Sequence, residues 1–191
     1  MSDVTLSPPA GLLDDPLPAR SARRRPRWLR QSLEVTFRGA LIFLLAQAWL
    51  VQGYRVYGCC MEPNLHSGER LLGSKLALVN GIHRGDVVVF QPPHRPGVAF
   101  IKRVIGLPGE VLAIRDNHVY VNGRELNEPY LHLAWHDDRA PERVPAHMLY
   151  VMGDNRDNSN DSRSWGELPV ANIQAKAWVR YWPPGRVGWI R

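Results

Sequence analysis

The chain has 191 residues, which is enough for one folded domain with a tail or an anchor, or for two small domains. Apolar residues make up 45% of it and charged residues 22%, as in ordinary globular proteins, which argues against a chain that is disordered throughout. The 16 glycines and 16 prolines favour short strands joined by turns over a helical bundle. The two cysteines, Cys59 and Cys60, are adjacent, so they provide neither the spacing of a metal site nor a disulfide framework.

The net charge of +6 raises the question of nucleic-acid binding, but the excess is concentrated near the N-terminus. An apolar stretch follows at once, and a basic cluster on one side of an apolar helix is typical of a membrane protein whose basic end stays in the cytoplasm. We therefore expect a lipid bilayer, and no nucleic acid, as the partner of this part of the chain. The cluster consists of Arg20, Arg23, Arg24, Arg25, Arg27 and Arg30.

Three regions are predicted along the chain. Residues 1–34 are expected to be a disordered basic tail in the cytoplasm, and residues 35–53 a transmembrane helix. Arg38 and Gln47 interrupt this apolar segment, which is short for a bilayer, so a buried helix or a cleaved secretory signal stays open as an alternative. If the helix spans the membrane once, residues 54–191 form an extracytoplasmic domain.

The pattern from residue 54 onward predicts a mainly β domain. Short apolar or alternating runs bounded by turn residues indicate strands, and Asn122-Gly123 is a hairpin-type turn signal. Residues 127–145 show no periodicity and are expected to be mostly loop. Strands are predicted at residues 86–91, 98–107, 110–115, 118–121, 148–152, 175–182 and 187–190.

Lys102 lies in an apolar row of one predicted strand. Residues two apart in a strand share a face, so Phe100 and Val104 flank Lys102 on the same face. Burial disfavours a charged ammonium, and a lysine held neutral near physiological pH can act as a general base. The alternative, from the strand pattern alone, is a lysine at a sheet edge whose amine reaches water.

A dense polar segment occupies residues 153–166. Asp, Asn and Ser at this density form backbone-bonded turns, so a solvated loop is one interpretation. A calcium loop is another, because Asp157, Ser159 and Asp161 alternate as its first ligands do. However, Ser162 replaces the required glycine and no glutamate closes the loop, so we reject calcium.

Three segments of the sequence stand out together: Cys60-Met-Glu-Pro-Asn-Leu65, residues 100–110 and residues 153–163. The first resembles the Ser-Met-x-Pro-Thr-Leu box of type I signal peptidases, and the second their Lys-Arg-Val-Ile-Gly-x-Pro-Gly-Asp box. The third is similar to their Gly-Asp-Asn-Arg-x-x-Ser-x-Asp-Ser-Arg box almost residue for residue. The boxes follow the family's order, and the likeness runs from about residue 38 to residue 182.

The resemblance implies an antiparallel-sheet domain with a serine/lysine dyad, which removes signal peptides from secreted preproteins at the outer face of the plasma membrane. Cys60 stands at the nucleophile position, its N–H would donate to the oxyanion, and Lys102 would be the general base. No cofactor or metal is implied. The other residues carried over are Ser159, which would orient the lysine; Asp154 and Arg103, an ion pair; Asp161 and Arg163, which would brace the site; and Met61 and Pro63, which would shape the nucleophile turn and the substrate site.

Three positions depart from the family pattern: Cys60 replaces serine, Asn64 replaces threonine, and Gly58 replaces a serine that supplies a second oxyanion donor in some members. Cysteine is more nucleophilic than serine and needs less help from a base. Its larger sulfur can misalign an oxyanion hole, and its thiolate can hold a neighbouring lysine protonated. We expect an active Cys/Lys peptidase, with an inactive relative or a deliberately altered site as the alternatives.

Two other classes of function compete with a peptidase. A catalytically impaired homologue would act as a membrane-tethered peptide-binding protein. A self-cleaving repressor, which also uses a Ser/Lys dyad, would need a DNA-binding domain for which the N-terminal part leaves no room. His132 and His136 mimic a metal pair, but without a third ligand we expect no metal.

Overall fold

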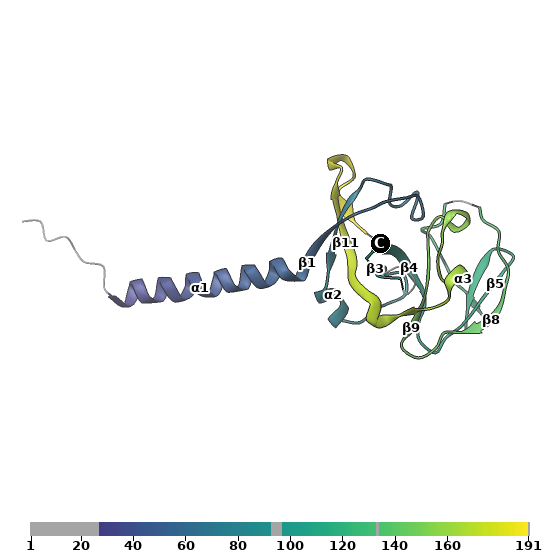
Figure 1. Ribbon diagram of the computed structural model, residues 1–191, viewed down its shortest axis with the longest axis horizontal. Coiled ribbons are helices and arrows are strands. Elements are labelled where there is room, and N and C mark those ends of the chain that lie inside the picture. The colour runs from purple at the N-terminus through teal and green to yellow at the C-terminus, as the bar shows by residue number, and fades with distance from the viewer. Residues whose placement is uncertain (1–26, 93–96, 133, 191) are drawn as a thin grey trace, which may run out of the picture. The chain divides into compact units, whose positions relative to one another are not determined.

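The computed structural model describes residues 27–92, 97–132 and 134–190 (Figure 1). The chain divides into two units between Leu41 and Ile42. The disordered tail was predicted over residues 1–34, and its residues 1–26 lie outside the described part.

Helix α1 spans Arg27–Leu50. It begins earlier than the predicted start at residue 35 and ends before the predicted end at residue 53, because Val51 already pairs with Ser74 in the sheet. Several apolar side chains of α1 are exposed: Leu33, Val35, Phe37, Leu41, Ile42 and Phe43. In the described part of the chain, no helix is both long enough and apolar enough to cross a bilayer.

The larger sheet has eight antiparallel strands within the described residues, in the order β1-β2-β11-β3-β4-β9-β10, with β12 paired to β11. Strand β4 therefore lies inside the sheet, between β3 and β9. The bounds are β1 Val51–Arg55, β2 Arg70–Ser74, β3 Val87–Phe90, β4 Phe100–Gly106, β9 Met148–Met152, β10 Leu168–Pro169, β11 Ile173–Trp182 and β12 Gly188–Trp189.

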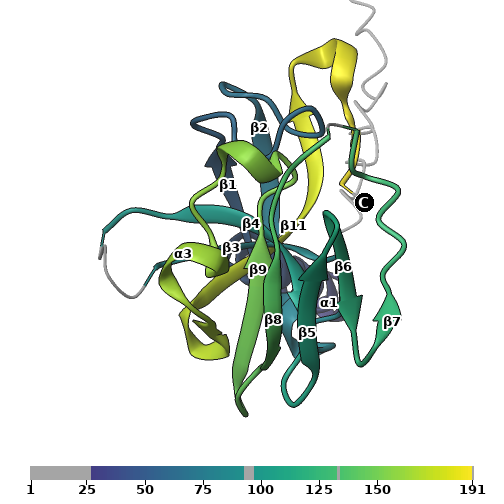
Figure 2. The same cartoon turned by 90° about the vertical axis from the view of Figure 1, so that its right-hand side faces the viewer.

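The smaller sheet has four antiparallel strands among the described residues, in the order β7-β6-β5-β8 (Figure 2). Its strands are β5 Val111–Arg115, β6 His118–Val121, β7 Arg124–Glu125 and β8 Arg139–Arg143. The β6–β7 turn is the predicted one, with Asn122 at φ 51° and Gly123 at φ 78°, the left-handed pair that a tight hairpin turn requires.

Short helical turns join the strands: α2 Leu76–Val79, η1 Arg156–Asn158, α3 Ser162–Trp165, η2 Val170–Asn172 and η3 Pro184–Arg186. The prediction of a mainly β, antiparallel domain is confirmed, and so are the strands predicted at the centre of each sheet. Residues 127–145 are mostly loop, as expected, but they include one strand that was not predicted, β8. Every residue of β8 is exposed, so its sequence carries no alternation between apolar and polar residues.

Three apolar cores hold this domain together. The first lies on the smaller sheet and includes Leu112, Ile114 and Trp135. The second lies along β3, β4 and β9, around Phe90 and Val104. The third surrounds the segment after β1 and consists of Val56, Met61, Leu65, Leu71, Val87 and Ala177. The third core contains Met61, and the neighbouring residue Cys60 packs against this core.

Candidate active site

A pocket of about 430 Å³ is lined mainly by residues from the end of β1, the segment after it and the first half of β4. Cys60 and Lys102 both line this pocket, although they come from different sequence boxes. Its wall is mostly apolar, as is usual for a site that binds side chains by shape. The lining residues are Tyr54, Arg55, Val56, Tyr57, Cys60, Leu71, Val89, Val98, Ala99, Phe100, Ile101, Lys102 and Asn160.

Cys60 lies in a tight turn, residues 59–65, which we call the Cys60 turn. The Glu62 amide donates to the Cys59 carbonyl at 3.1 Å, and the Leu65 amide donates to the Met61 carbonyl at 2.8 Å. Cys60 is half-buried, and its Sγ lies 3.9 Å from the carbonyl oxygen of Ile101. The thiol therefore faces the strand that carries Lys102.

Met61 and Pro63 support this turn from within. Met61 is fully buried in the third core, Pro63 is half-buried, and neither is among the described residues that line the pocket. Their part in substrate binding stays a prediction, and it would act through the shape of the turn rather than through direct contact.

Lys102 is buried in β4, with 3% of its surface exposed. Its Nζ lies 5.9 Å from the centre of the Phe100 ring and makes no hydrogen bond or ion pair with any described residue. The alternative of a lysine at a sheet edge is wrong, because β4 has a hydrogen-bonded neighbour on each side.

Ser159 lies beside the Cys60 turn. A Cβ built on Gly153 would lie 2.2 Å from Ser159 Oγ and 2.5 Å from the Cys60 carbonyl oxygen. Ser159 and the Cys60 turn can therefore both pack against Gly153 only because glycine has no side chain. Ser159 Oγ is buried and makes no hydrogen bond of ordinary geometry within the described residues. The role of Ser159 in orienting Lys102 stays a prediction.

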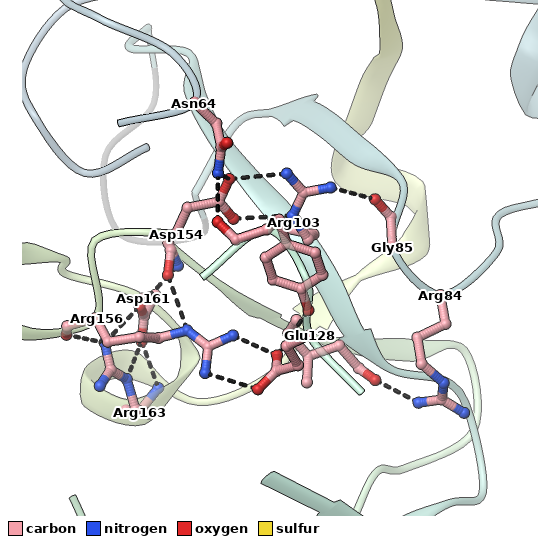
Figure 3. A network of polar contacts seen from close by, with 12 residues as sticks. Asn64, Arg84, Gly85, Arg103, Glu128, Asp154, Arg156, Asp161 and Arg163 are labelled. Carbon is pink, nitrogen blue, oxygen red and sulfur yellow. Dashed lines mark hydrogen bonds and ion pairs between the residues drawn. The ribbon is translucent and has the colours of Figure 1, made fainter. Parts of the chain in front are cut away.

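Arg103 and Asp154 form a buried ion pair behind the site (Figure 3). Arg103 Nε donates to Asp154 Oδ1 at 2.8 Å and Nη2 donates to Oδ2 at 2.7 Å, and each side chain is 1% exposed. Arg103 also donates to the Gly85 carbonyl and stacks its guanidinium 4.0 Å from the centre of the Tyr130 ring. The pair thus fixes the residue next to Lys102.

Asn64 joins the Cys60 turn to this ion pair. Its side-chain amide donates to Asp154 Oδ2 and to the Tyr130 carbonyl, both at 2.8 Å (Figure 3). The sequence marked Asn64 only as a departure from the family's threonine, and nothing in the local pattern indicated a contact with Asp154.

Asp161 and Arg163 form a second buried pair. Arg163 Nε donates to Asp161 Oδ1 at 2.8 Å, and the Gly153 amide donates to Asp161 Oδ2 at 3.0 Å. Burial alone would raise the pKa of Asp161, but the hydrogen bonds and charge of Arg163 outweigh it, and the pKa lies below its ordinary value. Asp161 also caps α3 by accepting from the Arg163 amide, so it fixes the polar segment to the sheet.

These features coincide with a match to a known family. The family model described as "Signal peptidase, peptidase S26" matches residues 29–182. The chain belongs to the signal peptidase family. Signal peptidase I of Leptolyngbya laminosa is 35% identical over 182 residues, which cover 90% of each chain.

Other relatives come from further bacteria. The probable signal peptidase I-1 of Synechocystis sp. is 34% identical over 85% of this chain and 87% of its own. Signal peptidase I of Bacillus licheniformis is 38% identical over 65% of this chain and 72% of its own. Among solved structures, a signal peptidase I from Enterococcus faecalis is 32% identical, covers 50% of this chain and 95% of its own, and has a TM-score of 0.45.

The second oxyanion donor of some signal peptidases has no counterpart side chain at Gly58. Gly58 has a φ of 83°, a conformation that side-chain-bearing residues rarely adopt, and its amide donates to Ser67 Oγ at 3.3 Å. The backbone N–H of Gly58 is therefore already engaged.

Asn155 is a further residue of the third box that the sequence reasoning missed. Its backbone N–H donates to the Cys60 carbonyl at 3.0 Å, and its side-chain amide donates to the Cys59 carbonyl at 3.2 Å. The third box includes Asn155, but the box does not reveal its contacts. They form because the loop that contains Asn155 folds back over the Cys60 turn, which is far away in the sequence.

Proposed function

We propose that this member of the signal peptidase family removes signal peptides from secreted preproteins, with Cys60 as the nucleophile and Lys102 as the general base. The observation that carries the proposal is the common pocket of Cys60 and Lys102, in which the lysine is buried without an ion-pair partner among the described residues. A desolvated amine without a carboxylate beside it is suited to accept a proton.

The reaction would proceed by acyl transfer. Lys102 takes the proton of the Cys60 thiol as the sulfur attacks the scissile carbonyl, and the Cys60 N–H donates to the resulting oxyanion. The C–N bond then breaks, and the lysine ammonium gives its proton to the leaving amine. Water, deprotonated by Lys102, hydrolyses the thioester and restores the thiol.

As the family resemblance implies, the substrates would carry small side chains at the −1 and −3 positions. The mostly apolar wall of the pocket is suited to apolar side chains such as alanine. The substrate would lie as an extended strand, which presents alternate side chains to the pocket.

The test is cleavage of a preprotein with an Ala-x-Ala site by the parent and by Cys60→Ser, Cys60→Ala and Lys102→Met. The parent and Cys60→Ser should cleave, whereas Cys60→Ala and Lys102→Met should lose at least about a thousandfold. Lys176→Met is the matched control, because Lys176 pairs with Asp86 and does not line the pocket, and it should retain activity. Substrate binding without cleavage by both the parent and Cys60→Ser would favour the non-catalytic binding protein.

We also propose that α1 tethers the chain to the plasma membrane by a single crossing, with the N-terminus in the cytoplasm and the β domain outside. The basic cluster before the exposed apolar side chains of α1 supports this orientation. Protein that pellets with membranes, resists carbonate and is digested by protease from outside would support a single crossing. Release by carbonate would instead restrict α1 to the membrane surface.

A further inference from the structure

A pair of arginines outside all three sequence boxes also holds the Cys60 turn. Arg180, on β11, donates through Nη1 to the Asn64 carbonyl at 2.8 Å. Arg186, in η3, donates through Nη2 to the same carbonyl at 3.3 Å and to the Pro63 carbonyl at 3.4 Å. Two cations therefore converge on two successive carbonyl groups of this turn.

A buried carboxylate fixes these arginines. Glu69 is 2% exposed, and its oxygens lie 3.3 Å from Arg180 Nη1 and 2.9 Å from Arg186 Nη1. The His66 amide donates to the same carboxylate at 3.1 Å, and Arg180 Nε donates to the Arg186 carbonyl. Because a buried carboxylate is stable only when it is paired, it holds both guanidinium groups in place. We call Glu69, Arg180 and Arg186 the arginine clamp.

The Cys60 turn is thus held at both ends by different parts of the chain. Asn155 holds the carbonyls of Cys59 and Cys60, and the arginine clamp holds those of Pro63 and Asn64. The peptide group that contributes the Cys60 N–H is the one whose carbonyl, that of Cys59, accepts from Asn155. A displacement of the clamped end would be transmitted through Met61 and Glu62 to this anchored peptide group, and would move both the thiol and the N–H of Cys60.

We propose that Arg180 and Arg186 are positioning residues for the nucleophile, which act by holding the second half of the Cys60 turn. The inference rests on the proposed role of Cys60. Neither arginine lines the pocket among the described residues, so they position the reacting group without contacting the substrate. Catalysis is sensitive to displacements well below 1 Å, whereas substrate binding in an apolar pocket is less so.

The test compares Arg180→Met with Arg180→Lys and with Arg143→Met in the full chain. Arg143 is a matched control, because it is exposed and also donates to a backbone carbonyl, that of Gly109, at 2.7 Å. Arg180→Met should lower kcat roughly ten- to a hundredfold, with KM changed by less than about threefold. Arg143→Met should leave both constants at the parent's values.

Arg180→Lys separates charge from geometry. It keeps a cation opposite Glu69, so its unfolding midpoint should stay close to that of the parent, while a single ammonium cannot reproduce the planar guanidinium contacts and kcat should stay reduced. Full recovery of kcat by lysine would overturn the positioning role. So would an Arg180→Met variant whose kcat equals that of Arg143→Met, or one in which only KM changes.

A second measurement does not require peptide cleavage. In a Cys59→Ser background, iodoacetamide modifies Cys60, and Arg180→Met should raise this rate by at least about threefold, because a freed turn exposes the half-buried thiol. If the parent does not cleave any preprotein, the proposed function fails, and the alkylation rate still tests the clamp. An alkylation rate equal to that of the Arg143→Met control, well below the unfolding midpoint, would overturn it.

Discussion

The buried ion pair of Arg103 and Asp154 allows a quantitative prediction for the substitution Asp154→Asn. The asparagine keeps the shape of the side chain and one acceptor oxygen, but it removes the charge that faces a guanidinium with only 1% of its surface exposed. Arg103 would keep its hydrogen bond to the Gly85 carbonyl and its stacking on Tyr130.

Removing one member of a buried ion pair costs about 3–5 kcal/mol. In a protein of this length, each kcal/mol shifts the unfolding temperature by about 2–4 °C, so Asp154→Asn should unfold roughly 6–20 °C below the parent. The loss in free energy of unfolding should exceed the loss caused by removing one member of an exposed ion pair. Glu125→Gln, which removes the partner of the exposed His118, should change the free energy of unfolding by less than about 0.5 kcal/mol.

Urea unfolding of the parent and both variants measures these differences. The double variant Arg103→Met/Asp154→Leu should recover most of the loss, because it removes both charges and leaves apolar side chains of similar volume. A cost for Asp154→Asn no larger than that of Glu125→Gln would refute the reasoning, and so would a double variant less stable than Asp154→Asn.

Two further predictions concern the polar segment around the site. Burial raises the pKa of Asp161, but the contacts with Arg163 lower it more, to below 3.8. The contribution of the Asp161 carboxylate to the stability of the folded protein is therefore complete above about pH 5 and is lost as the pH falls through the lowered pKa. The difference in urea midpoint between the parent and Asp161→Asn should therefore shrink on going from pH 7 to about pH 3, and a difference that grows would contradict the assignment. Gly153→Ala should lower the cleavage rate by more than about tenfold, because its Cβ would lie 2.2 Å from Ser159 Oγ and 2.5 Å from a carbonyl of the Cys60 turn. Gly188→Ala, whose Cβ meets nothing within 4 Å, should leave cleavage unchanged, and equal effects of the two alanines would rule out the steric explanation.

The fold was predictable where the sequence carried a periodic pattern or a specific turn. Apolar runs at residues 86–91 and 148–152 correspond to the buried strands β3 and β9, and Asn122-Gly123 marks the turn between β6 and β7. Strand β8 has five exposed residues, so its backbone pairing with β5 left no trace in side-chain polarity.

The burial of Lys102 was predicted for an incomplete reason. Alternation put Lys102 on an apolar face, yet Arg103 and Ile105, on the opposite face, are as deeply buried. Strand β4 lies inside the sheet and is covered on both faces, so alternation alone could not say which of two neighbouring cations faces the pocket. The resemblance to the second box made that choice.

The arginine clamp was beyond reach of the sequence for a geometric reason. Strict alternation along β11 puts Arg180 on the face opposite Ala177, which is buried in the third core beneath the Cys60 turn. The pairing of β11 with β2 shifts register between Ala177 and Val179, and again between Arg180 and Trp182. Each irregularity re-aims the side chains that follow it, so the direction of Arg180 is set by the sheet and not by its neighbours in sequence. Deletion of Trp178, which lies at the first shift, would let Ala177, Val179 and Arg180 pair with Gly73, Leu72 and Leu71 in regular succession. Residues two apart in a regular strand share a face, so the deletion should keep Arg180 on the face of Ala177 and in contact with Asn64, with kcat close to that of the parent. A kcat as low as that of Arg180→Met would contradict this account of how the sheet directs Arg180.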